Sequence, residues 1–136
     1  MKTIATKVLD RLILAVYATR NPSDKEWDDY LRLIEQHGID RSKQLIATEG
    51  GAPTSGQRRR LKELLGGRRV PVAVISRNAL VRGSVTGLTW FNSKIQAFPP
   101  SGLRDALAHL DITASRAKLI DGELHKLRNE LEGQTP

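Results

Sequence analysis

The chain has 136 residues, the size of one domain that can bury a single hydrophobic core. It contains no cysteine, which excludes disulfides, thiolate metal sites and cysteine nucleophiles. The net charge is +7, and the excess is local: residues 51–100 carry nine Lys and Arg against one acidic residue, which gives +8, whereas the flanking segments nearly balance. This asymmetry favours an anionic partner, such as nucleic acid, a phosphorylated or acidic protein, or a membrane surface.

The first apolar run is too short to cross a membrane. Leu12–Ala18 has seven residues and lies between Arg11 and Arg20, whereas a spanning helix needs about 20 apolar residues. No charged and apolar leader with a small-residue cleavage site precedes it. We therefore expect a buried strand in this run, a cytoplasmic location and no membrane insertion.

The first half of the chain predicts two strands, a helix and a third strand. Ser23 and Glu26 have the spacing of a capping box, which marks the beginning of a helix. A continuous aliphatic run is typical of a central strand covered on both faces. The predicted elements are strands over residues 2–8 and Leu12–Ala18, a helix from Ser23 to Gly38, and a strand over Gln44–Thr48.

The second half continues the alternation of helices and strands. Thr54 and Gln57 repeat the capping-box spacing. Gly83 and Gly87 lower the helix propensity of their segment, which we interpret as room for close approach to the sheet. The predicted elements are helices from Thr54 to Gly66, over Asn78–Phe91, from Ser101 to Leu110 and from Thr113 onward, with strands over Val70–Ile75 and Ile95–Phe98.

This order predicts an α/β fold with a mixed sheet. Strands joined through helices are parallel neighbours, and the short first link makes the first two strands antiparallel. We expect four parallel strands plus an antiparallel edge strand over residues 1–111, followed by an amphipathic helix and short tail over residues 112–136. The final helix carries an apolar stripe that either packs on the domain or pairs with a partner or second copy: Ala117, Ile120, Leu124, Leu127 and Leu131.

Over about residues 2–110 the element order resembles the STAS domain, the fold of anti-sigma-factor antagonists. In that family a serine at the start of the helix after the third strand is phosphorylated, within an Asp-Ser-Ser-Gly pattern. The matching stretch here is Pro53-Thr54-Ser55-Gly56, so Thr54 takes the phosphorylated position and Pro53 replaces the acidic residue. The resemblance implies a non-enzymatic module of bacterial-type signalling that binds a regulatory protein, with Thr54 or Ser55 as the switch.

Two site hypotheses follow from the residues between 49 and 69. In the first, a protein partner docks on Glu49–Arg60, where two glycines loosen the loop before a helix N-terminus that favours anions. In the second, the Arg58–Arg69 cluster binds nucleic acid or a phosphate-bearing ligand. A solvated loop and surface is the competing interpretation of both. The candidate contacts are Gly50, Gly51, Arg58, Arg59, Arg60, Arg68, Arg69 and Trp90, and the basic cluster also includes Lys62, Arg77 and Arg82.

No reactive set is evident in the sequence. His37, His109 and His125 are scattered, without the spacing of a metal site. Neither a nucleophile elbow nor a P-loop is present. We therefore predict no catalytic residues, no metal and no cofactor.

Overall fold

The computed structural model describes residues 2–86 and 94–133. Its centre is a five-stranded sheet in the order β1-β2-β3-β4-β5. The first strand pairs antiparallel with the second, and the remaining pairs are parallel. The expected α/β fold with a mixed sheet is thus confirmed. The strands are β1 (Ile4–Leu9), β2 (Leu12–Tyr17), β3 (Lys43–Thr48), β4 (Val72–Ile75) and β5 (Ile95–Phe98).

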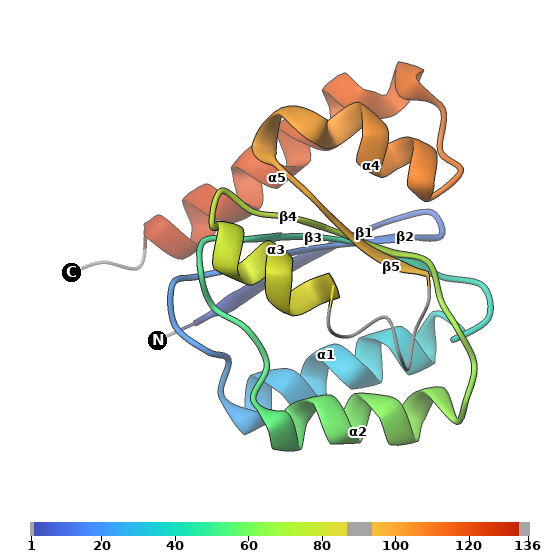
Figure 1. Cartoon of the computed structure of the whole chain (residues 1–136), viewed down its shortest axis with the longest axis vertical. Coiled ribbons are helices and arrows are strands. Elements are labelled where there is room, and N and C mark those ends of the chain that lie inside the picture. Colours follow the sequence, from blue (N-terminus) through green and yellow to red (C-terminus); the bar gives the residue numbers. More distant parts are fainter. Residues whose placement is uncertain (1, 87–93, 134–136) are drawn as a thin grey trace.

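Helices cover the two faces of the sheet unequally (Figure 1). Because the strand order advances in one direction, right-handed crossovers place the first three helices on one face. The last two helices lie on the opposite face. A short 3-10 turn precedes each of them, over Pro100–Gly102 and Ala114–Arg116. The helices are α1 (Asp24–Gln36), α2 (Ser55–Leu65), α3 (Ala79–Thr86), α4 (Leu103–His109) and α5 (Ala117–Glu132).

Strand β2 contributes side chains to both hydrophobic cores, one on each face of the sheet. All six of its residues are buried, and successive side chains point to opposite faces. Leu14 and Val16 pack with residues of α4 and α5, while Ile13 and Ala15 pack with the aromatic side of α1. The aliphatic run in the sequence therefore has the role expected of it, since a strand covered on both faces needs no polar alternation.

The apolar stripe of α5 packs against the chain's own sheet. Ile120, Leu124, Leu127 and Leu131 are buried in the same core as Leu14, and α5 contacts β1 and β2. The stripe therefore packs on the domain, which is one of the two arrangements that the sequence left open. It is thus not available for a homodimer in this structure.

The two sheet-side glycines expected in the third helix have different outcomes. Helix α3 is described through Thr86, so Gly87 lies outside the described residues. At Gly83 no described atom lies within 4 Å of the place where a Cβ would stand. The interpretation of Gly83 as a point of close approach is therefore wrong.

The packing of α5 can be tested by a matched pair of leucine variants. Leu124 is 5% exposed and Leu119 is 55% exposed on the same helix. We expect Leu124→Ala to lower the free energy of unfolding by about 2–5 kcal/mol, because truncation leaves a cavity in the core. Leu119→Ala should change it by no more than about 0.5 kcal/mol. Urea denaturation followed by circular dichroism measures both, and equal effects would contradict the packing described here.

Candidate functional site

The loop from Glu49 to Pro53 lies at the edge of the sheet where β2, β3 and β4 end. The start of β1 and the end of α5 lie at this same edge (Figure 1). Helix α2 begins here and runs to the opposite edge, and at 11 residues it is about 16 Å long. The two ends of α2 therefore belong to different surfaces of the molecule.

Hydrogen bonds tie this loop to the segment that follows β2. Gly51 N donates to Ala18 O at 2.8 Å, and Ala52 N donates to Asn21 Oδ1 at 3.1 Å. Within the loop, Thr48 Oγ1 donates to Gly51 O at 2.6 Å. These hydrogen bonds hold the loop that precedes α2 in one conformation.

Gly51 is required by close backbone approach. It is buried, and a Cβ at this position would lie 2.2 Å from Arg20 O and 2.6 Å from Ala18 O. Gly50 is half-buried and has a φ of +136°, a conformation that favours glycine. Both glycines therefore shape the loop, and Gly51, predicted as a contact, presents no surface to a ligand.

A pair of glycine variants tests this packing. We expect Gly51→Ala to lower the free energy of unfolding by at least about 1–3 kcal/mol, because two carbonyls would have to move. Gly122→Ala is the control, since Gly122 is exposed on α5 and no described atom lies within 4 Å of the place where its methyl group would stand. It should raise stability by about 0.5–1 kcal/mol through helix propensity. A neutral Gly51→Ala variant in thermal denaturation would refute the close approach.

The start of α2 has the capping box that the sequence predicted. Thr54 Oγ1 accepts from Gln57 N at 3.2 Å, and Thr54 N donates to Gln57 Oε1 at 3.0 Å. Thr54 and Ser55 are both exposed. The Thr54 side chain is therefore used in helix capping, whereas Ser55, the first residue of the helix, has no such task.

Gln57 fastens α2 to α1. Its side chain is 2% exposed, and its Nε2 donates to Pro22 O at 2.8 Å. Its backbone carbonyl oxygen accepts a hydrogen bond from Trp27 Nε1 at 2.9 Å. The sequence predicts only a capping role for Gln57, because the contacts to Pro22 and Trp27 join residues 35 and 30 positions apart.

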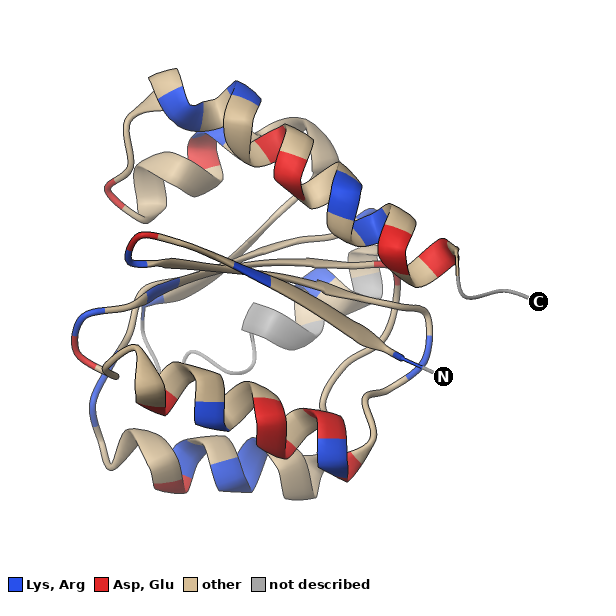
Figure 2. Ribbon diagram, turned by 180° about the vertical axis from the view of Figure 1, so that it is seen from behind, with Lys and Arg blue, Asp and Glu red and all other residues tan. Residues whose placement is uncertain are grey.

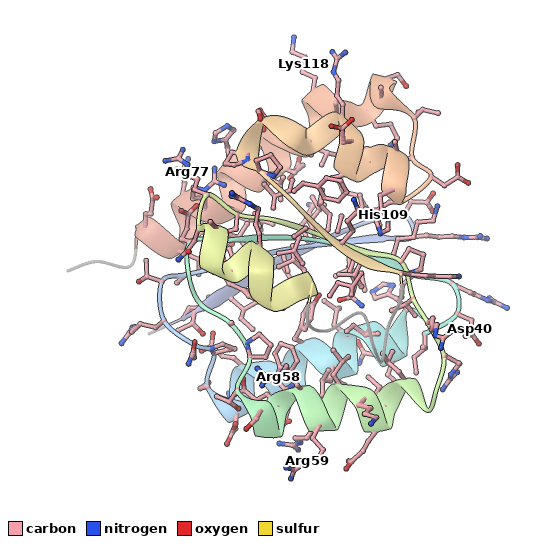
Figure 3. The ribbon with its side chains drawn as sticks, in the orientation of Figure 1. Asp40, Arg58, Arg59, Arg77, His109 and Lys118 are labelled. Atoms are coloured by element: carbon pink, nitrogen blue, oxygen red, sulfur yellow. The ribbon has the colours of Figure 1, made fainter. Side chains whose placement is uncertain are left out.

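The three consecutive arginines have three different environments. Arg58 donates to Pro53 O at 2.9 Å. Arg60 lies 2.8 Å from Asp28 Oδ1, an ion contact whose groups are not aligned as a hydrogen bond. Arg59 is exposed and points away from the body of the protein (Figure 3). Only part of the run therefore presents uncompensated charge to solvent.

The remaining basic candidates lie at both edges of the sheet. Arg68 follows the far end of α2, where it lies 3.5 Å from Asp40 Oδ2, and Arg69 lines a pocket at that edge. Arg77 and Arg82 follow β4, and Arg82 donates to Ser76 O at 2.7 Å. Arg77 and Asp40 mark opposite sides of the molecule in Figure 3. The structure thus does not bring Arg58–Arg69 together into one patch.

Glu26 has a role that its capping-box spacing does not predict. Ser23 caps α1 as predicted, but the Glu26 carboxylate also accepts from Thr3 N at 2.7 Å, Thr3 Oγ1 at 2.8 Å and Ile4 N at 3.1 Å. Burial acts to raise the pKa of Glu26, and these hydrogen bonds together outweigh it and hold the pKa below its usual value. The carboxylate thereby anchors β1 to the start of α1.

The lowered pKa of Glu26 makes its contribution dependent on pH. A folded-state pKa below the unfolded one stabilises the fold above about pH 4.3, and the contribution is lost as pH falls through the folded value. We expect Glu26→Gln to lower the free energy of unfolding at pH 7 by about 1.5–3 kcal/mol. The difference from wild type should shrink below about pH 4. Exposed Glu35→Gln is the control, and a difference independent of pH would contradict the assignment.

The described residues show no group of three or more His, Cys, Asp or Glu placed to hold a metal ion. Nor does the described part of the chain include a helix long and apolar enough to span a bilayer. Trp90, the remaining candidate contact, lies outside the described residues. Comparisons with protein-family models, curated proteins and solved structures give no match.

Proposed function

We propose that this chain is a non-catalytic regulatory module of STAS type that binds a partner protein through residues 49–60. We call this region the docking surface. It comprises the loop after β3 and the first turns of α2. Its rigidity supports the proposal, since a loop already held by hydrogen bonds loses little conformational entropy on binding.

The observation that carries the proposal is the position of Ser55. It is exposed at the first residue of α2, three and four residues before Arg58 and Arg59. Residues at these spacings are neighbours on a helix surface. A phosphate on Ser55 would lie by the positive end of the helix dipole and beside two guanidinium groups, where its charge is stabilised.

Ser55 suits this role better than Thr54. The resemblance to STAS domains aligns Thr54 with the phosphorylated position, and both hydroxyls are exposed. Modification of Thr54, however, would act on an oxygen that accepts from Gln57 N and would disturb the cap of α2. We therefore assign the switch to Ser55, with Thr54 as the residue that holds the helix in place.

The alternative function, nucleic-acid or phosphate binding through Arg58–Arg69, has less support. It needs those cations on one surface, but α2 separates them and two of them are paired with Asp28 and Asp40. Nucleic-acid binding would show affinity that falls steeply with salt. A gel-shift assay at low salt therefore distinguishes the two functions.

Affinity capture from the native cell with phosphomimetic variants tests the proposal. We expect wild type and Ser115→Glu to recover the same partner, since Ser115 is exposed in a separate 3-10 turn. Ser55→Glu and Arg59→Glu should change its recovery about tenfold or more, because each alters the charge at the docking surface. Mass spectrometry quantifies the partner, and thermal denaturation checks that each variant is folded.

Two outcomes would refute the proposal. One is equal recovery of every protein by wild type, Ser55→Glu and Arg59→Glu. The other is a change of the same size with Ser115→Glu, which would show a general response to charge rather than a docking surface.

A further inference from the structure

A second surface lies at the opposite edge of the sheet, where the parallel strands begin. A pocket of about 650 Å³ opens there, between the β1–β2 turn, the loops that enter β3, β4 and β5, and the connection from α4 to α5. Volumes of this size are typical of small-molecule sites. The docking surface, at the other end of α2, contributes no residue to it.

Cations from separate segments converge on this pocket. Three acidic residues, Asp10, Asp40 and Asp111, line it as well, so the lining carries an excess of three positive charges. The loops at this edge contain several Lys and Arg positions, on the left in Figure 2. The basic lining residues are Arg11, Arg41, Lys43, Arg69, Lys94 and Arg116.

Three arginines of this lining lack a salt bridge among the described residues. Asp40, one of the three acids, lies beside Arg68, which is outside the lining. Within residues 2–86 and 94–133, no salt bridge involves Arg11, Arg69 or Arg116. Among the described residues, these three arginines therefore add positive charge to the pocket that no ion pair offsets.

We infer that this pocket binds a small ligand that carries adjacent phosphate groups. Arginine forks from the β1–β2 turn, the α2–β4 loop and the start of α5 match phosphate oxygens in geometry and charge. The described residues of the lining offer these charged groups and no aromatic side chain. The inference therefore rests on recognition of the phosphates.

Ser42 supplies a further donor in the same wall. It lies between Arg41 and Lys43 and is 2% exposed. In the described part of the chain its Oγ has no hydrogen-bond partner, although buried hydroxyls normally have one. Rotation of this short side chain toward the pocket would give the hydroxyl a phosphate oxygen as its acceptor.

Calorimetric titration with inorganic tripolyphosphate tests the inference directly. At about 150 mM salt, where screening acts beyond about 8 Å, we expect saturable binding with one site per chain. The double variant Arg11→Gln/Arg69→Gln should bind about tenfold or more weakly, because it removes two charge-assisted contacts. Both residues are exposed, so the variant should keep its fold, which thermal denaturation verifies.

A control double variant removes the same charge elsewhere. Lys25 and Arg104 are exposed on α1 and α4 and do not line the pocket. Lys25→Gln/Arg104→Gln should therefore bind tripolyphosphate as wild type does. Equal weakening in both double variants, or no saturable binding by wild type, would overturn the inference.

Two further ligands identify the source of the phosphates. Binding of ATP as tightly as tripolyphosphate would support a nucleotide source, while binding of tripolyphosphate alone would support a non-nucleotide phosphate compound. Binding of a single-stranded oligonucleotide without binding of tripolyphosphate would overturn the inference that the pocket binds a small phosphate ligand. None of these measurements involves Ser55, so the inference and the proposed function stand or fall separately.

Discussion

The structure depends on burying both faces of β2 and β3. These neighbours hold aliphatic side chains toward each face, so an uncovered face would expose a large apolar surface to water. Three crossovers in one direction cover only one face, and α4 and α5 must cover the other. The last helix is therefore part of the core, which explains why its apolar stripe is not left for a partner.

The same topology rearranges the charges of the sequence. Arg58 and Arg68 are close along the chain, but α2 carries them to opposite edges of the sheet. Arg11 and Arg116 are far apart in sequence, and the β1–β2 turn and the start of α5 bring them to one pocket. The net charge of residues 51–100 therefore does not locate either surface, because the crossovers carry the charged residues of this segment to different edges of the sheet.

The parts of this fold that sequence could predict are those with local causes. Apolar runs, the Thr54–Gln57 capping box and the stop at Gly66 depend on residues within a few positions of one another. Glu26 binds the start of β1, a contact 23 residues distant, while its capping-box spacing suggested only a local role. The sequence suggested close approach at Gly83, yet among these described glycines it is Gly51, in the loop after β3, whose added Cβ would meet a neighbouring backbone. The pocket has no sequence signature, since its lining comes from separate loops.

The basic residues of the docking surface and of the pocket have different surroundings. At the docking surface, the Pro53 carbonyl holds Arg58 and the Asp28 carboxylate holds Arg60, whereas Arg59 is exposed. At the pocket, six cations outnumber three aspartates, and repulsion among the excess positive charges opposes folding. A bound polyanion would relieve that repulsion and stabilise the folded state through linkage. A cavity that gathers repelling charges is thus better explained by an anionic ligand than by the needs of the fold.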